Sequence, residues 1–284
     1  MELRQHTLAF EGLHPVFAAL YFVGVLVLVM SLVHPVTLAL AALTGVAYGV
    51  RLKGWQRVGK SLLWQIPMLL IIMVLNPVFN QMGQTRLAEA FGLVVYAESL
   101  AYGACMGLLL LATLQWFSNA ACVLTSDKIM ALLGPVAPTT GLLVTMTMRL
   151  VPHFVKRGSL VADTRQACTA AAASAGPLRT GVRQTTVLMG WGMEDSLETA
   201  DAMRARGWGA AGKRTSYVRQ RLRAFDIAAC AALLALLALC AVCHVAIGLS
   251  FSFYPELQGW APLALYIPFG LLLLVPCGLE VACS

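Results

Sequence analysis

Long apolar blocks recur along this chain, and they limit its fold more than any other feature. Each block has roughly 17–25 residues, which is enough to cross a lipid bilayer as an α-helix. Of the 284 residues, 59% are hydrophobic and 12% are charged, whereas soluble domains are usually about 45–50% apolar. The first block has no small-residue cleavage site after it, so we expect it to be retained. The sequence therefore predicts an all-α polytopic membrane protein.

We expect about six membrane spans, near residues 14–33, 35–51, 60–75, 98–120, 225–248 and 259–279. His34-Pro35 separates the first two spans, because proline ends one helix and is favoured in the first turn of the next. The stretch 129–150 is interrupted by Pro135 and Pro138, and we expect it at the membrane surface. The predicted parts are amino-terminal spans in 1–121, a middle region in 122–224 and a carboxy-terminal hairpin of spans in 225–284.

Positive charge predicts the orientation of these spans. Cytoplasmic loops of membrane proteins carry an excess of lysine and arginine. Fourteen of the twenty Lys and Arg residues lie from Lys128 to Arg223, and four more lie together from Arg51 to Lys60. With both termini in the cytoplasm, every loop fits this rule except the one that holds Arg86. We expect a multi-pass plasma-membrane protein, and its net charge of +7 indicates topology, with no nucleic acid as a partner.

Eight cysteines are scattered through the chain, and one pair has the CxxC spacing. Cys240, Cys243 and His244 form a CxxCH sequence, the spacing of covalent haem attachment. They lie inside an apolar span, with no second ligand set for zinc. This favours small side chains packed in a helix, with no metal or cofactor. An intramembrane redox or haem enzyme stays as an alternative.

The residues from about 183 to 206 form the strongest helix candidate outside the membrane. Four apolar residues recur at helical spacing on one face: Met189, Met193, Leu197 and Met203. Acidic residues come early and Arg204 and Arg206 come last, which suits the helix dipole. Gly207 is well suited to the left-handed conformation that closes a helix. Because methionine adapts to different partners, the apolar face fits either core packing or docking.

Several catalytic signatures are missing from the sequence. It has no GxxxxGK[ST] loop, no HExxH and no GxSxG. Acidic residues also stay out of the span interiors, where ion-coupled carriers usually place them. We therefore expect the chain to have no catalytic residues of its own. Two GxxxG pairs, Gly45/Gly49 and Gly103/Gly107, permit close helix packing within the chain or with another membrane subunit.

Four blocks resemble the transmembrane (T) component of energy-coupling factor (ECF) transporters. They are LNPVFNQMGQT (75–85), LQWFSNAACVLTSDKIMALLGPVAP (114–138), MRLVPHFVKR (148–157) and GWGMEDSLETADAMRARGWG (190–209). The resemblance implies a non-catalytic subunit whose long cytoplasmic coupling helices, here in 122–224, hold one or two kinds of ATP-binding-cassette (ABC) ATPase. It also implies a small membrane substrate-binding (S) component that takes up a vitamin or a metal ion.

The resemblance assigns roles to residues of the last block. Ala205-Arg206-Gly207 matches the second x-Arg-x motif of the family, so Arg206 is expected to enter a groove of one ATPase. An arginine suits that role because its planar fork holds a carboxylate through two hydrogen bonds and stays charged. Arg204 faces elsewhere on the helix. Met189, Met193, Leu197 and Met203 are expected to provide an adaptable face for the S component or for the first coupling helix.

The first x-Arg-x motif departs from the family pattern. The aligned triplet is Ala167-Cys168-Thr169, with no central arginine, and Arg165 is the nearest substitute. This departure points to two different ATPases or one ATPase with two halves, and the cobalt-type branch of the family is also loose at this motif. A membrane anchor that recruits another soluble complex through the same basic helices is the alternative function.

Overall fold

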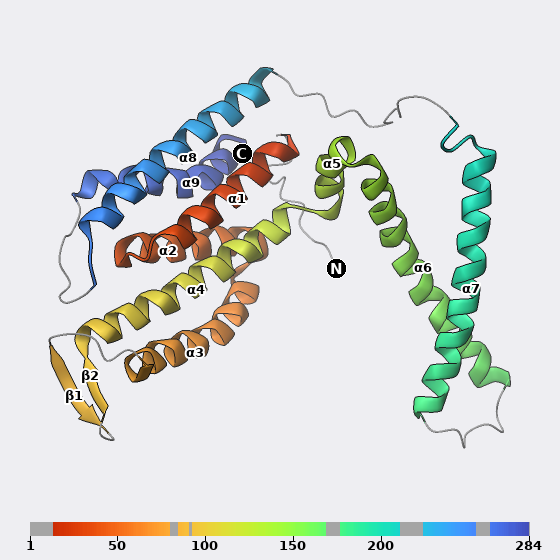
Figure 1. Cartoon of the computed structure of the whole chain (residues 1–284), viewed down its shortest axis with the longest axis horizontal. Coiled ribbons are helices and arrows are strands. Elements are labelled where there is room, and N and C mark those ends of the chain that lie inside the picture. The colour runs from red at the N-terminus through yellow and green to blue at the C-terminus, as the bar shows by residue number, and fades with distance from the viewer. Residues whose placement is uncertain are drawn as a thin grey trace. The chain divides into compact units, whose positions relative to one another are not determined.

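The computed structural model describes residues 14–79, 85–90, 93–168, 177–210, 224–253 and 262–283. The chain divides into two compact units, one of residues 1–129 with 220–284 and one of residues 130–219. Helices dominate both units (Figure 1), as the all-α prediction requires. The predicted domain boundaries, 1–121, 122–224 and 225–284, stay a prediction.

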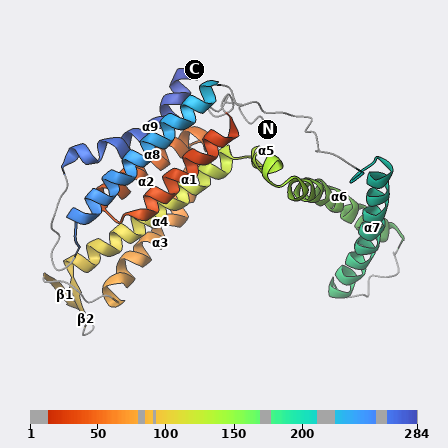
Figure 2. The same cartoon turned by 45° about the horizontal axis from the view of Figure 1, so that its top comes forward.

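The first unit is a bundle of apolar helices that run side by side (Figures 1 and 2). Its helices are α1 (Pro15–Ser31), α2 (Pro35–Lys53), α3 (Trp55–Phe79), α4 (Ala97–Val123), α8 (Ala224–Ser250), the short 3₁₀ helix η1 (Leu263–Leu265) and α9 (Ile267–Cys283). Pro35 occupies the first turn of α2, and His34 caps it by accepting a hydrogen bond from the Val36 N–H. The predicted break at His34-Pro35 is therefore present.

Four of these helices are long and apolar enough to cross a membrane: α2, α3, α4 and α8. The chain is thus a helical membrane protein by the length and composition of these segments. Helix α1 has 17 residues, and the apolar segment Leu263–Gly278 is also shorter. A total of six spans stays a prediction.

A two-stranded hairpin precedes α4, where the sequence predicted only helices and loops. Strands β1 (Arg86–Ala90) and β2 (Leu93–Tyr96) pair antiparallel, with Ala88 opposite Val95. Both strands are short, and β2 is rich in the β-branched and aromatic residues that favour strands. The Glu98 Oε1 atom accepts hydrogen bonds from the backbone N–H of Thr85, at 3.2 Å, and from its hydroxyl, at 2.6 Å. These bonds hold the base of the hairpin to the start of α4.

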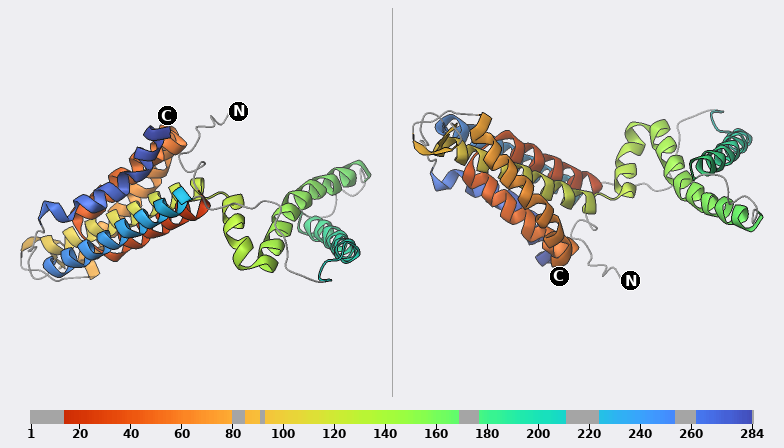
Figure 3. Two further views of the ribbon diagram at one scale, coloured as in Figure 1. Left: turned by 90° about the horizontal axis from the view of Figure 1, so that it is seen from above. Right: turned by 90° about the horizontal axis from the view of Figure 1, so that it is seen from below.

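Helix α4 is the central element of the bundle and contacts α1, α2 and α3. Its Trp116 is fully buried and lies against the rings of Tyr21, Phe22 and Tyr48. In Figure 3, α3 lies at the outside of the bundle beside α4. The core of this unit therefore forms around α4, while α3 keeps most of its surface exposed.

Both predicted glycine pairs pack within the chain. A Cβ atom on Gly103 would lie 2.9 Å from the Asn76 Cβ atom and 3.0 Å from the Met73 carbonyl oxygen of α3, and one on Gly107 would lie 2.8 Å from Leu69. A Cβ atom on Gly45 or Gly49 of α2 would likewise lie 2.5–3.0 Å from side chains of α4. The absence of side chains at these positions lets α2 and α3 approach α4 closely.

The second unit contains most of α5 (Ser126–Val136) and all of α6 (Pro138–Cys168) and α7 (Pro177–Ala205). The stretch 129–150 breaks at Ala137, between the two predicted proline interruptions. Pro138 occupies the first turn of α6, and the helix continues through Pro152. One internal proline removes a single backbone hydrogen bond, which a helix of 31 residues tolerates.

Candidate functional site

Helix α7 ends in a closed backbone motif around Gly207. The Gly207 N–H donates to the Arg204 carbonyl oxygen at 2.9 Å, and the Trp208 N–H donates to the Met203 carbonyl oxygen at 3.0 Å. This pair of bonds is the Schellman arrangement, which needs a left-handed residue just after the helix. Gly207 supplies it, with φ of 78°. The predicted helix end at Gly207 is present, although α7 starts earlier than predicted, at Pro177.

Arg206 lies within this closing turn, and its side chain is exposed. Its backbone N–H donates to the Ala202 carbonyl oxygen at 3.2 Å. Within residues 177–210 and the other described ranges, the guanidinium of Arg206 has no acidic or hydrogen-bonding partner. The flanking Ala205 and Gly207 are exposed as well. The motif therefore presents an arginine whose charge is available to another molecule.

Arg204, two residues earlier, is engaged differently. Its Nη1 atom lies 3.9 Å from the Asp201 Oδ1 atom, one turn back, and both side chains are about four-fifths exposed. Exposed ion pairs of this kind contribute little to stability. Arg204 is consequently a surface charge on the α7 helix, whereas Arg206 lies beyond the last helical residue.

An aromatic cluster joins α6 to α7. The Trp191 ring of α7 lies 5.2 Å from the His153 ring and 5.4 Å from the Phe154 ring, both edge-on, and the Arg157 guanidinium lies 4.1 Å from the Trp191 ring centre. Edge-to-face aromatic pairs and cation–π contacts each stabilise such a junction by roughly 0.5–1.5 kcal/mol.

Polar and close-packed contacts extend the junction towards the start of α7. The Gln184 Nε2 atom donates to the Gly158 carbonyl oxygen at 2.8 Å. A Cβ atom on Gly158 would lie 3.7 Å from Leu188, and one on Gly192 would lie 2.5 Å from Phe154. Since early α7 residues meet later α6 residues, the two helices run antiparallel. The two glycines permit their close approach.

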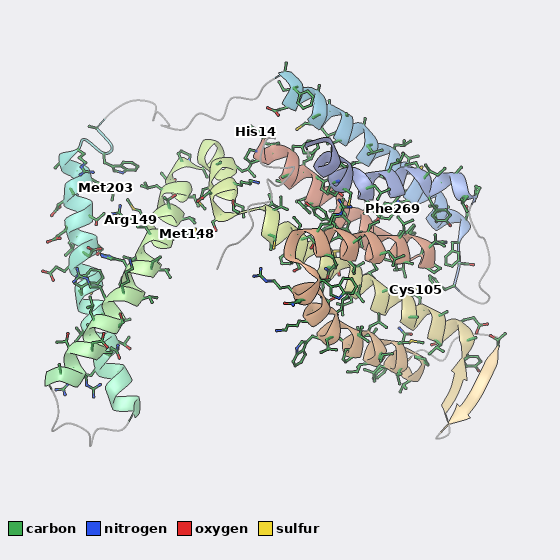
Figure 4. The ribbon with its side chains drawn as sticks, turned by 180° about the vertical axis from the view of Figure 1, so that it is seen from behind. His14, Cys105, Met148, Arg149, Met203 and Phe269 are labelled. Atoms are coloured by element: carbon green, nitrogen blue, oxygen red, sulfur yellow. The ribbon has the colours of Figure 1, made fainter. Side chains whose placement is uncertain are left out.

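The predicted methionine face does not form this junction. Met189, Met193 and Leu197 are 66%, 70% and 66% exposed, while Gln184, Leu188, Trp191 and Asp195 of the same helix are half-buried. Met203 is half-buried near the end of α7, and Met148 and Arg149 lie in α6 (Figure 4). The three exposed side chains thus lie away from the contacts with α6 in this structure, and the roles expected for the methionine face stay predictions.

Arg165 lies on the face of α6 that meets α7. Phe154, Gly158, Val161 and Arg165 follow one another at spacings of three or four residues and are all half-buried. Arg165 is therefore turned towards the helix pair and already has an interaction of its own. Cys168 is the last residue of α6, and Thr169 of the aligned triplet lies outside the described residues.

The CxxCH sequence lies in the interior of the bundle. The His244 Nδ1 atom is 3.0 Å from the Cys240 carbonyl oxygen within α8, and the His244 ring lies edge-on at 4.7 Å from Phe269 of α9. Figure 4 shows Phe269 within the bundle. Among the residues that the structure describes, no group of three or more His, Cys, Asp or Glu side chains gathers in a way that could hold a metal ion.

A second buried histidine, His34, lies in the turn between α1 and α2. Its Nδ1 atom accepts from the Val36 N–H at 3.3 Å, so the neutral ring carries its proton on Nε2 and donates it to the Tyr266 hydroxyl oxygen at 3.1 Å. Burial lowers the pKa of the His34 imidazole from its ordinary value, and the neighbouring His244 lowers that pKa further. The cap of α2 therefore depends on a neutral histidine.

The described residues form a bundle of apolar helices, four of them long enough to cross a membrane, and a second helical unit. No protein-family model matches the chain, and no curated protein matches it. Its function is therefore argued from its residues.

The sequence analysis missed the side chains that join α6 to α7: Phe154, Arg157, Gln184 and Trp191. The available signal was the repeat of three and four residues from Phe154 to Arg165, together with the same repeat from Gln184 to Asp195. The methionine face has an equally regular spacing. Spacing alone therefore did not tell which face of α7 meets α6.

Proposed function

We propose that this chain is the transmembrane coupling subunit of an ECF-type ABC importer. It links ATP hydrolysis by one or two ABC-type ATPases to a small membrane S component that takes up a vitamin or a metal ion, and it performs no catalysis itself. The observation that carries the proposal is the closed end of α7, which holds an exposed Arg206 without a partner in the described part of the chain.

The docking chemistry rests on the guanidinium of Arg206. A groove lined by carboxylates binds it through two parallel hydrogen bonds, and the charge persists at any physiological pH. The backbone bonds at Gly207 and Trp208 restrict the turn on which Arg206 lies. Binding therefore costs little backbone entropy, which is an advantage of preorganised contacts.

Transmission of movement rests on the helix pair. Helix α7 has 29 residues, which corresponds to a length of about 43 Å. The contacts of Trp191 and Gln184 with α6 make the two helices move together when an ATPase moves the end of α7. Arg165 lies within this junction, and we propose that it supports the first coupling helix in place of the missing central arginine at Cys168.

The methionine face supplies the surface for the S component. Met189, Met193 and Leu197 are exposed on α7, and methionine side chains repack easily against a partner that changes position. The charge distribution supports a plasma-membrane location with both termini in the cytoplasm, which brings the coupling helices to the side where ATP is available.

The test is affinity purification of the tagged chain from native membranes in a gentle detergent, with partners identified by mass spectrometry. We expect one or two ABC ATPases and a small hydrophobic protein to be recovered with the wild type and with Arg204→Ala. Arg206→Ala should lose the ATPase by at least tenfold, because removal of a buried interfacial arginine typically costs about 2–5 kcal/mol, while still inserting in the membrane.

Recovery of equal ATPase with Arg206→Ala would contradict the docking role of Arg206. Recovery of a soluble complex other than an ATPase, together with the absence of ATP-dependent uptake in vesicles, would favour the membrane-anchor function instead. Loss of activity on His244→Ala combined with no effect of Arg206→Ala would favour the redox alternative.

A further inference from the structure

The turn between α2 and α3 concentrates positive charge without any acidic residue nearby in the sequence. Residues 35–84 contain Arg51, Lys53, Arg57 and Lys60 and no Asp or Glu. A single residue, Gly54, separates the two helices, and its φ of 84° allows α3 to begin at once. The four basic residues are thus held on two helix ends and not on a long loop.

One of the four basic side chains is used internally. The Lys53 Nζ atom donates to the Ser118 hydroxyl and, at 3.2 Å, to the Asn119 Oδ1 atom, both on α4. Asn119 in turn donates to the Gly45 carbonyl oxygen at 2.8 Å. This network holds the end of α2 to α4, and the Lys53 ammonium group has its hydrogen-bond partners within it.

The other three cations are exposed. Arg51, Arg57 and Lys60 are exposed, and none of them forms an ion pair or a side-chain hydrogen bond within the ranges that the structure describes. The exposed side chain of Trp55, at 76%, lies between them in sequence. No acidic side chain in the described part of the chain pairs with these three cations, which leaves them available to a negatively charged ligand.

One face of α3 continues from these cations into apolar residues. Arg57, Lys60, Trp64, Met68, Ile71 and Leu75 recur at spacings of three or four residues, and all are exposed. Trp64 is 83% exposed and Ile71 is 57% exposed. Such spacing places the side chains on one stripe of a helix, which we call the α3 stripe.

The chemistry of the α3 stripe follows the layers of one lipid leaflet. Lysine and arginine suit the headgroup layer, tryptophan suits the interface, and aliphatic residues suit the acyl chains. From Trp64 to Leu75 the helix rises by about 16 Å, close to half of a hydrocarbon core of about 30 Å. The face is therefore matched in length as well as in chemistry to a phospholipid.

We propose that the α3 stripe and Arg51 bind an anionic phospholipid, with Arg51, Arg57 and Lys60 around its phosphate headgroup and its acyl chain along Met68, Ile71 and Leu75. The negative headgroup supplies a counter-charge that none of the described residues provides for these three cations. This proposal does not depend on the ATPase partners or on the cargo.

An orientation signal alone would require only the number of cations on one side of the membrane. A lipid-binding site must in addition prefer anionic to neutral headgroups, even when the protein is not oriented in a membrane. Detergent micelles remove orientation, so they separate the two roles.

The experiment uses the purified, delipidated full chain in detergent micelles. Brominated phosphatidylglycerol or brominated phosphatidylcholine is added, and tryptophan quenching is measured. The contribution of Trp64 is the difference between the wild type and Trp64→Phe. We expect half-maximal quenching of Trp64 at a phosphatidylglycerol concentration roughly tenfold below that of phosphatidylcholine, because each cation near an anionic surface adds appreciably to binding.

Matched variants assign the preference to the α3 stripe. Arg57→Gln with Lys60→Gln should remove the preference, whereas Lys156→Gln with Arg183→Gln, which removes two exposed charges from α6 and α7, should keep it. The exchange Arg57→Lys with Lys60→Arg keeps both charges and should also keep the preference, which controls for folding.

Three results would overturn the proposal. Equal quenching by both lipids in the wild type would leave the cations as orientation signals. Displacement of phosphatidylglycerol by millimolar inorganic phosphate would mean that a free anion, not a lipid, is bound. Absence of Trp64 quenching by either lipid would mean that a second copy of the chain covers the α3 stripe.

Discussion

The indole N–H of Trp116 donates a hydrogen bond of 2.9 Å to the carbonyl oxygen of Ala41. The bond joins two neighbouring helices of the bundle, α4 and α2, at a position where both residues are fully buried. In an interior that water does not reach, such a bond has no substitute partner. Helix α2 is thus held to α4 by hydrogen bonding as well as by packing.

We expect Trp116→Phe to lower the stability of the bundle by about 1–3 kcal/mol, because it removes this donor and leaves part of the indole volume empty. The measurement is thermal unfolding of the purified protein in detergent. Trp64→Phe changes an exposed side chain and should leave the unfolding temperature unchanged. An equal shift in both variants would mean that the bond to Ala41 does not stabilise the bundle.

Close approach of α3 and α4 depends on Gly103. A leucine side chain there would meet the backbone of Met73 and the Cβ atom of Asn76 at about 3 Å, so the helices must separate. We expect Gly103→Leu to cost about 1–3 kcal/mol or more, seen as a lower unfolding temperature. Gly59→Ala on α3 has open space around it and should be neutral or slightly stabilising. Full stability of Gly103→Leu would exclude tight α3–α4 packing.

The junction of α6 and α7 depends on Trp191. Its replacement by alanine removes the ring contacts with His153 and Phe154 and the cation–π contact with Arg157, a loss of about 1–3 kcal/mol. We expect faster amide hydrogen exchange throughout α7. Val187→Ala, at an exposed position of the same helix, should leave exchange unchanged. Exchange that stays slow in Trp191→Ala would assign the junction to Gln184 and the close-packed glycines.

The end of α7 depends on the conformational freedom of Gly207. Alanine at φ of 78° costs roughly 1–2 kcal/mol, which frays the turn that carries Arg206. If that turn docks an ATPase, Gly207→Ala should weaken ATPase recovery about fivefold or more. Gly190→Ala, in the interior of α7 with open space around it, is the control. Undiminished recovery with Gly207→Ala would show that docking does not need the ordered turn.

Acidification should destabilise the bundle through His34. Its pKa is lower in the folded chain than the unperturbed value of about 6.5, so the unfolded chain takes up the proton first. Neutral His34 therefore makes its full contribution to the free energy of unfolding above about pH 6.5. This contribution decreases as the pH falls towards the pKa of His34 in the folded chain. Protonation also places an N–H on Nδ1 against the Val36 N–H. The unfolding temperature should fall between pH 7.5 and 5.5.

His34→Asn isolates this effect, because asparagine keeps a capping acceptor for α2 and does not titrate. The variant should be less stable than the wild type at pH 7.5, since it loses the bond to Tyr266, and its unfolding temperature should depend less on pH. His14→Asn, at the start of α1, should retain the pH dependence. An unchanged slope in His34→Asn would assign the effect to another group, with His244 the first to examine.

Local signals in the sequence predicted the helix ends well. His34-Pro35 marks the break between α1 and α2, and Gly207 marks the end of α7, because proline and glycine act through the backbone of their own position. Proline was less informative inside a long helix. Pro152 lies in the middle of α6 and does not end it, since the neighbouring turns supply enough hydrogen bonds to continue the helix.

Contacts between distant residues were less predictable. The exposure of Met189 and the burial of Trp191 depend on which side of α7 meets α6, and both faces have helical spacing. The hairpin at 86–96 was missed because its strands are four and five residues long, too short for a clear alternation of apolar and polar residues. Arg206 could be proposed from its motif, but only the structure shows that its guanidinium has no partner among the described residues.

Main-chain hydrogen bonds between Met203, Arg204, Gly207 and Trp208 close the turn after α7. The side chain at position 206 makes no contribution to that closure. If position 206 docks a partner as we propose, folding and recognition depend on different residues: Gly207 maintains the shape of the turn, and the side chain at 206 meets the partner. A substitution at 206 would then change partner binding without a penalty in folding.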